Sequence, residues 1–259
     1  MTGSRESSTS YEAADGSELP ILAFDPAESA QPVAGIVMFH GGGLRSGSAD
    51  GLAPHCRQLA SRGIFAVSAG YRLIGQGAMS IDDCIADVRR AVEHFLRLAA
   101  VRGLDSSRLA SGGSSAGAHL ALVAAMIAPD RPVSVPDPGV AAVVALNPVV
   151  DLLGYSPDQQ RSLEQVAGIA TGRLIDYSPA EFVRPGNPPT LIQHGTHDEV
   201  APIGQVRRFQ DVMVQAGNDC VLLEYEGAEH AFHYPGPAGR FDDVIDAAVE
   251  FLLDRLAAQ

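Results

Sequence analysis

The segment Leu109-Ala-Ser-Gly-Gly-Ser-Ser-Ala-Gly-Ala-His-Leu120 passes from an apolar, strand-like run into an alanine-rich helical pattern. Its centre, Gly113-Ser-Ser-Ala-Gly117, is a Gly-x-Ser-x-Gly sequence at that junction. A strand that turns sharply into a helix presents the central side chain outside the sheet, and flanking glycines avoid clashes in the turn. Ser115 is therefore the candidate nucleophile in preference to Ser114, and the helix N-terminus at Ala116 adds positive potential beside it.

Apolar runs and helical patterns alternate around this junction. The strand-like runs are Pro20–Phe24, Gly35–Phe39, Ile64–Ala69, Arg108–Gly112, Ala141–Leu146, Thr190–Gln193 and Val221–Tyr225. The helical patterns are Asp83–Ala100, Ser115–Ile127, Ile203–Gln215 and Phe241–Ala258. Several strand-like runs are apolar throughout, which is typical of strands buried on both faces. The pattern predicts a doubly wound, mostly parallel α/β sheet with helices on both faces and ligands beyond the carboxyl ends of its strands.

A second glycine-rich turn follows the strand-like run that ends at Phe39, in the segment His40-Gly-Gly-Gly43. Glycines let backbone N–H groups approach a reacting carbonyl closely. Gly42 and Gly43, together with the N–H group of Ala116, are the candidate oxyanion-hole donors. His40 is expected to orient this loop by hydrogen bonding rather than to act as a base. The supporting motif residues are His40, Gly41, Gly113 and Gly117.

Two later loops supply candidates for the remaining catalytic groups. Asp198 is the first acidic residue beyond the glycine turn after the run Thr190–Gln193, and Glu199 is its neighbouring competitor. His230 follows the run that ends at Tyr225, and His233 is the alternative base three residues later. The chain order Ser115, Asp198, His230 is the Ser–Asp–His order expected of a triad on an α/β sheet.

The composition narrows the classes of partner. A net charge of −13 repels phosphate backbones and anionic membrane surfaces, so no nucleic-acid or membrane partner is expected. Cys56, Cys84 and Cys220 form no CxxC pair, which gives neither a zinc motif nor a disulfide framework, and no metal site is expected. The polar N-terminus lacks the apolar core of a signal peptide, and a cytoplasmic location is expected.

The chain of 259 residues is expected to form a single α/β domain over residues 1–259. Residues 1–15 are a candidate flexible N-terminus. Residues 151–189 have no strand-like run, are rich in Pro, Gly, Ser and Asp, and contain one short helical stretch near 162–169. This segment is either a surface excursion or a small lid, and the sequence leaves both readings open.

Together these segments resemble the α/β-hydrolase carboxylesterases of the hormone-sensitive-lipase type and the related acetyl-esterase and feruloyl-esterase group. The matching pieces are His40-Gly-Gly-Gly43, Gly113-Ser-Ser-Ala-Gly117, Asn147-Pro-Val-Val-Asp151, His194-Gly-Thr-His-Asp198 and Gly227-Ala-Glu-His230-Ala-Phe232. The segment Ser46–Arg72 also resembles bacterial acetyl-xylan esterases. The similarity extends from about Val33 to the end of the sequence. It departs at Ser114, where many members carry Asp, and before Val33, where the stretch is too short for their N-terminal helical cap.

The resemblance implies an α/β-hydrolase fold with a minimal cap or none. It also implies a serine carboxylesterase that works through an acyl-enzyme on Ser115 without any cofactor, but it does not determine the acyl group. The lack of an obvious apolar lid in the sequence favours short acyl groups, acetyl above all. The expected partner is a small-molecule ester, with acylated sugars among the candidates, and the expected state is a monomer or a homodimer.

Three other functions compete with this one. An arylformamidase-like amide hydrolase would use the same triad, and rates on formyl-amide and acetyl-ester substrates separate the two. A peptidase usually needs a larger gating domain than this length allows. A non-catalytic ligand-binding protein on the same fold would bind a ligand without turnover, and the complete set of candidate triad residues disfavours it.

Overall fold

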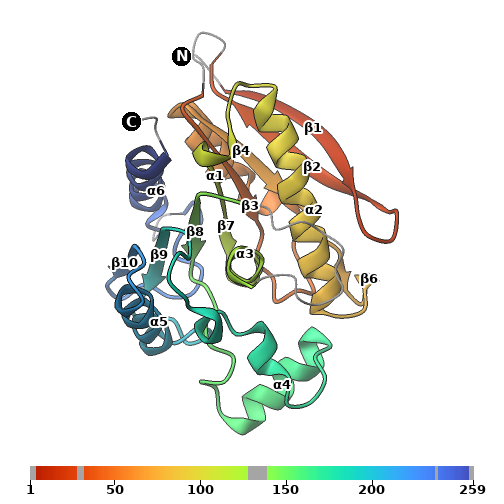
Figure 1. Cartoon of the computed structure of the whole chain (residues 1–259), viewed down its shortest axis with the longest axis vertical. Coiled ribbons are helices and arrows are strands. Elements are labelled where there is room, and N and C mark those ends of the chain that lie inside the picture. Colours follow the sequence, from red (N-terminus) through yellow and green to blue (C-terminus); the bar gives the residue numbers. More distant parts are fainter. Residues whose placement is uncertain (1–3, 28–31, 128–138, 237–238, 257–259) are drawn as a thin grey trace.

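The structure, a computed structural model, describes residues 4–27, 32–127, 139–236 and 239–256. An eight-stranded sheet in the order β1-β2-β4-β3-β7-β8-β9-β10 forms its centre (Figure 1). The strands are β1 Arg5–Glu12, β2 Glu18–Asp25, β3 Ala34–Phe39, β4 Ile64–Ala69, β7 Leu109–Ser114, β8 Ala142–Leu146, β9 Thr190–Gly195 and β10 Cys220–Tyr225, and the short strands β5 Leu73–Ile74 and β6 Gly77–Ala78 pair separately. In the large sheet the strands run parallel to one another in β3, β4, β7, β8, β9 and β10. Strand β2 is antiparallel to β4, and β1 is antiparallel to β2. The predicted mostly parallel sheet is confirmed.

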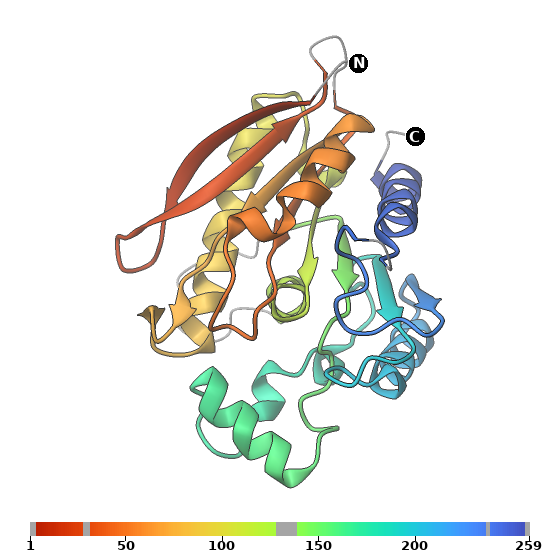
Figure 2. The same ribbon diagram turned by 180° about the vertical axis from the view of Figure 1, so that it is seen from behind.

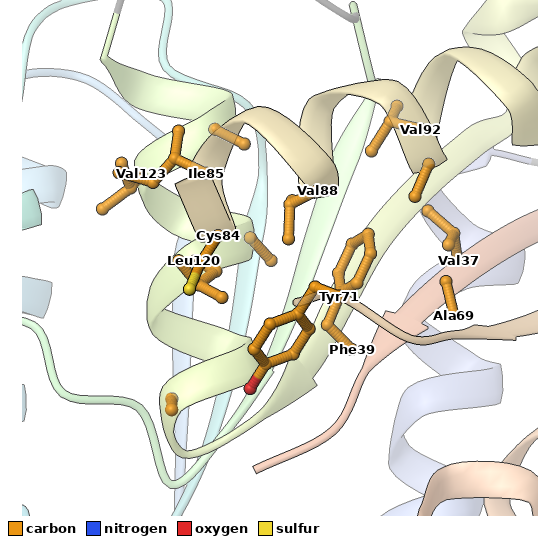
Figure 3. Close-up of a cluster of buried hydrophobic side chains, with 14 of the residues drawn as sticks. Val37, Phe39, Ala69, Tyr71, Cys84, Ile85, Val88, Val92, Leu120 and Val123 are labelled. Atoms are coloured by element: carbon orange, nitrogen blue, oxygen red, sulfur yellow. The ribbon is translucent and has the colours of Figure 1, made fainter. Parts of the chain in front are cut away.

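Helices cover both faces of this sheet (Figures 1 and 2). They are α1 Ala53–Ser61, α2 Ile81–Ala100, α3 Ala116–Met126, α4 Pro157–Ala167, α5 Ile203–Gln215 and α6 Phe241–Leu256. Successive side chains of β3 point to opposite faces, so Val37 and Phe39 pack in the cluster with α2 and α3, while Ile36 and Met38 pack in the cluster with α1 and α6. Figure 3 shows α2 lying over Val37 and Phe39. Residues 257 and 258 of the predicted last helix lie outside the described residues.

The N-terminal segment differs from the expectation of a flexible stretch at residues 1–15. Arg5–Glu12 forms the edge strand β1, paired in antiparallel register with β2 along its whole length. Most of its side chains are exposed, with Tyr11 buried near its end. A polar strand with one paired edge carries no apolar pattern, and its conformation depends on β2 rather than on its own residues.

The segment 151–189 leaves the sheet after β8 and returns at β9. It contains α4 and the short 3₁₀ turns Leu174–Tyr177 and Pro179–Phe182. Helix α4 begins with a capping box in which the Ser156 and Gln159 side chains bond each other's backbone N–H groups, and Gly168 ends it in a left-handed conformation. Figure 2 shows α4 set apart from the sheet, beyond the ends of the central strands.

Candidate active site

The turn between β7 and α3 has a strained backbone at Ser115, with φ 52° and ψ −118°. A non-glycine residue rarely adopts positive φ, and such strain is typical of functional turns. The flanking glycines allow close packing against the end of β3. A Cβ atom on Gly113 would lie 2.4 Å from the Phe39 carbonyl oxygen, and one on Gly117 would lie 2.0 Å from it. The two glycines therefore let the serine turn pack directly against the neighbouring strand.

We expect Gly117→Ala to lower the free energy of unfolding by about 3 kcal/mol or more, because the new Cβ would collide with backbone that cannot move aside cheaply. The matched control is Gly204→Ala, also at the second position of a helix. A Cβ there meets only the Arg208 guanidinium at 3.7 Å, so the change should be neutral or stabilise by up to about 1 kcal/mol. Urea unfolding of both variants checks this, and equal midpoints would contradict it.

The structure brings Ser115, His230 and Asp198 into one hydrogen-bonded line. His230 Nε2 lies 2.8 Å from Ser115 Oγ, and His230 Nδ1 lies 2.7 Å from Asp198 Oδ2. Because the carboxylate only accepts, Nδ1 carries the ring proton and Nε2 is left to accept from the serine hydroxyl. This is the geometry that a nucleophile, its base and the group orienting that base require.

Asp198 is buried, and both of its carboxylate oxygens accept hydrogen bonds. Its Oδ1 accepts from the N–H groups of Val200 and Ala201, and its Oδ2 accepts from His230 and lies 3.2 Å from His194 Nε2. Burial raises the pKa of the Asp198 carboxyl, but hydrogen bonds from His194, His230 and the backbone outweigh burial and hold that pKa well below its usual value. The carboxylate therefore stays ionised beside the imidazole.

The alternatives to these three residues are Glu199, Ser114 and His233, and they lie outside this hydrogen-bonded line. Glu199 is exposed, whereas Asp198 is 5% exposed and faces the imidazole. Ser114 and His233 are both buried and bond each other, with 2.8 Å between Ser114 Oγ and His233 Nε2. The structure thus holds a second serine–histidine pair directly behind the first, closed off from solvent.

This second pair continues to His55 on α1, whose Nε2 lies 3.1 Å from His233 Nδ1. Burial lowers the pKa of His55 from 6.5 to about 4, and burial also holds the pKa of His233 well below its usual value. The unfolded chain takes up protons on these rings near pH 6.5 while the folded chain does not. Folding stability therefore falls as the pH drops from about 6.5 towards 4.

We expect His55→Leu to flatten this acid destabilisation, since each such histidine contributes up to about 1.4 kcal/mol per pH unit. Urea unfolding of the wild type and the variant at pH 7 and pH 5 measures the difference. An identical loss of stability in both proteins would contradict the assignment of His55 as a neutral buried ring.

The glycine loop after β3 runs beside the serine turn. Gly42 and Gly43 have positive φ values of 116° and 61°, and a Cβ on Gly42 would lie 2.1 Å from the Ser46 carbonyl oxygen. Gly43 and Ala116 line the cavity next to Ser115, whereas Gly42 is not among the lining residues. Two of the three expected oxyanion donors are therefore at the cavity wall, and the third lies one residue back along the loop.

His40 contacts the loop that it precedes. Its Nδ1 lies 2.7 Å from the Gly41 carbonyl oxygen, and its ring stacks on Tyr71 with 4.4 Å between centroids. The Tyr71 hydroxyl donates to the His40 carbonyl, and Gly47 packs against the imidazole, where a Cβ would approach Nδ1 to 2.4 Å. The ring is thus packed from two sides against the glycine loop.

A cavity of about 280 Å³ opens beside Ser115. Its walls are mainly aliphatic and come from the glycine loop, α2, α3, the segment after β8, and α4. The lining residues are Gly43, Leu44, Ile81, Ser115, Ala116, His119, Val149, Leu152, Tyr155, Gln159, Ser162, Leu163, Val166, Ala167, Ile169 and Val200. The cavity is therefore suited to an apolar group that lies next to the Ser115 hydroxyl.

Within the described residues, no group of three or more His, Cys, Asp or Glu side chains is arranged to hold a metal ion. Across the same ranges, no helix is both long enough and apolar enough to cross a membrane.

Sequence reasoning did not single out two side chains that contact this line, or a third that contacts His233 behind it. Asn147 lies over the His230 ring, His194 bonds Asp198, and His55 bonds His233. Asn147 and His194 each open one of the quoted motif pieces, which is the signal that could have marked them. His55 lies in the segment Ser46–Arg72 that resembles acetyl-xylan esterases, but its contact could not be foreseen because its partner is 178 residues away in the chain.

Similar proteins share this fold and this arrangement of segments. The BD-FAE family model matches residues 23–213. An esterase of the planctomycete Thermogutta terrifontis is 31% identical with a TM-score of 0.82, over 97% of this chain and 92% of that one. Its propionate-bound structure is 32% identical with a TM-score of 0.83, over 99% of this chain and 97% of that one.

A relative named "Probable carboxylic ester hydrolase LipM", from Mycobacterium tuberculosis, is 30% identical over 235 residues, which are 85% of this chain and 54% of LipM. An ethyl acetate hydrolase of Pseudomonas putida is 33% identical over 153 residues, which are 57% of this chain and 46% of that protein. The chain spans about half the length of these curated relatives. It belongs to the BD-FAE family and is an α/β-hydrolase of the carboxylesterase type.

Proposed function

We propose that the protein hydrolyses carboxylic esters with short acyl groups through an acyl-enzyme on Ser115. The observation that carries this proposal is the continuous hydrogen-bonded line from Asp198 through His230 to Ser115. A buried, ionised carboxylate at one end and a strained serine at the mouth of an apolar cavity at the other end add support.

The chemistry follows from the proton positions. His230 Nε2 takes the Ser115 proton as Oγ attacks the ester carbonyl, and the N–H groups of the glycine loop and Ala116 stabilise the oxyanion. His230 then protonates the leaving alcohol, and water hydrolyses the acyl-enzyme with the same ring as base. Asp198 holds the tautomer and stabilises the imidazolium that forms in each step.

The cavity sets the expected size of the acyl group. Its volume leaves room for more than acetyl, and the propionate-bound form of the Thermogutta terrifontis esterase supports a short acyl chain in this chain also. We expect hydrolysis of p-nitrophenyl acetate and butyrate to be much faster than that of the octanoate, because the acids bound in structures of that relative, propionate and butyrate, are short. Octanoate as the fastest substrate, or a folded protein inert on all three, would overturn the proposal.

In this proposal the segment 151–189 serves as a small fixed lid. Helix α4 supplies one wall of the cavity through Leu163 and Val166. The Arg45 guanidinium, from the glycine loop, donates to the Val166 carbonyl at 3.2 Å, and Gly168 packs so closely that a Cβ would lie 2.6 Å from the Met79 carbonyl oxygen. These contacts support a lid that stays closed rather than one that opens for each turnover.

Val166→Phe tests the wall. The larger side chain fills acyl space, so we expect kcat/KM on butyrate to fall at least roughly tenfold relative to kcat/KM on acetate. Gln165→Phe, on the exposed side of the same helix, is the matched control and should leave the butyrate-to-acetate ratio unchanged. If both variants change the ratio equally, α4 does not form the acyl wall.

A further inference from the structure

Asn147 lies at the end of β8 in a position that the proposed mechanism does not use. It is 1% exposed, and its backbone has a φ of 41°, the left-handed region that Asn tolerates better than most residues. Its N–H group donates to the Gln193 carbonyl at 2.8 Å, which fixes the turn against β9. The strained backbone directs the side-chain amide between Ser114 and His230.

The amide nitrogen lies over the face of the His230 ring. Asn147 Nδ2 is 3.0 Å from His230 Nε2 and 3.3 Å from His230 Nδ1. The two ring nitrogens flank the Cε1–H group, so an atom this close to both in the ring plane would collide with that carbon. The contact is therefore an N–H group against the ring face, and it leaves the in-plane Nε2 lone pair free for Ser115.

The donor and the acceptor of each contact behind Asn147 can be assigned by starting from a backbone carbonyl oxygen. His55 Nε2 lies 3.0 Å from the His233 carbonyl oxygen, which only accepts, so His55 Nε2 carries the ring proton. The same nitrogen lies 3.1 Å from His233 Nδ1, which must then accept, and the His233 proton is on Nε2. Burial lowers the pKa of both rings, so both are neutral at pH 7 and each has one ring proton.

The same assignment of donors and acceptors extends from His233 through Ser114 to the active site. His233 Nε2 donates to Ser114 Oγ at 2.8 Å, so the Ser114 hydroxyl proton is directed away from His233, where Asn147 Oδ1 at 3.5 Å and the Tyr234 hydroxyl are its two acceptors. With its oxygen towards the Ser114 hydroxyl, the amide presents its N–H group to His230. The four side chains from α1, β7, the turn after β8 and the loop after β10 thus determine which end of the amide faces the catalytic ring.

We propose that Asn147 is a positioning residue for His230, whose oriented amide N–H group packs on the imidazole and opposes positive charge on it. The ionised Asp198 favours the imidazolium from the ring edge, while His194, bonded to Asp198, and the neutral His233 add no negative charge. Asn147 offsets part of the Asp198 effect and keeps the ring a neutral base at lower pH. The inference rests on the proposed function, since it concerns the base of that reaction.

Asn147→Gly removes the amide without adding backbone strain, because glycine accepts a positive φ. We expect the acidic limb of the kcat/KM pH profile on p-nitrophenyl butyrate to move to higher pH by roughly half a unit to one unit. A role limited to packing would lower the rate and leave that midpoint in place. A midpoint at the wild-type pH, or at a lower one, overturns the inference.

Ser114→Ala and Ser111→Ala form a matched pair on β7, both at buried serines. Loss of the Ser114 hydroxyl frees the amide to turn its oxygen towards His230, which should shift the acidic limb in the same direction as Asn147→Gly. Ser111→Ala should leave the limb at the wild-type midpoint. An equal shift in both serine variants would mean that the strand, and not the ordered contacts, causes the change, and it would contradict the inference.

An NMR titration of the His230 ring in the resting protein separates this inference from the proposed function, because it needs no turnover. The titration midpoint should rise in Asn147→Gly relative to the wild type by the same amount as the acidic limb. A shifted titration in a protein without esterase activity supports the inference and refutes the function. Turnover with equal titration midpoints in both proteins refutes the inference alone.

Discussion

Ser115→Ala is expected to lower kcat on p-nitrophenyl butyrate by roughly 10⁴- to 10⁶-fold, the range found when a triad nucleophile is removed. The serine hydroxyl is the atom that forms the covalent bond, and no other hydroxyl is brought to His230 Nε2 in the described residues. Alanine keeps the Cβ atom, so the strained backbone at φ 52° gains no new strain. The variant should therefore remain folded, which circular dichroism and urea unfolding check.

Ser114→Ala is the matched control for the nucleophile, because it removes the neighbouring hydroxyl on the same turn. Ser114 is 2% exposed and bonds His233 rather than His230. We expect this variant to keep kcat at its pH optimum within about tenfold of the wild type, with some loss of stability from the unpaired His233 donor. Inactivity of Ser114→Ala together with activity of Ser115→Ala would reverse the assignment.

His230→Gln is expected to lower kcat by roughly 10⁴-fold or more, since the base and the acid of both half-reactions are lost together. Glutamine keeps a polar side chain next to Asp198, so the buried carboxylate retains a possible donor and the fold should survive. Stopped-flow or steady-state rates at pH 8 measure the effect.

His233→Gln decides between the two histidines that the sequence left as alternatives. His233 is fully buried and lies on Ser114. Its loss should lower the free energy of unfolding by about 1–3 kcal/mol through broken buried hydrogen bonds and leave most of kcat in place. If this substitution abolishes turnover in a folded protein while His230→Gln does not, His233 is the base and the proposed triad is wrong.

The sheet was predictable because its central strands are apolar on both faces. The runs assigned to β3, β4, β7, β8 and β9 are buried throughout, and such runs between helical patterns have few other interpretations. Strand β1 was not predictable, because a polar, mostly exposed strand owes its conformation to its partner. Helix α1 was also missed, since nine residues that include Pro54 give too short a pattern to recognise.

The same difference between local and distant contacts determines which parts of the site could be predicted. The serine turn and the glycine loop are local backbone features, so Gly113, Gly117 and Gly43 could be placed from their neighbours in the sequence. The chain of contacts through His55 and Asn147 joins four elements and depends on their packing. Whether residues 151–189 form a loop or a lid also depends on packing, because it turns on which side of α4 faces Ser115.

Covalent labelling with an organophosphate would identify the nucleophilic residue, which we expect to be Ser115. The protein would be incubated with diethyl p-nitrophenyl phosphate, an organophosphate that phosphorylates the related Thermogutta terrifontis esterase. Mass spectrometry of the intact chain and of its peptides would follow. We expect one diethylphosphoryl group per chain, located on Ser115, with loss of esterase activity in step with labelling. Full labelling at Ser114, or esterase activity that survives complete labelling of Ser115, would contradict it.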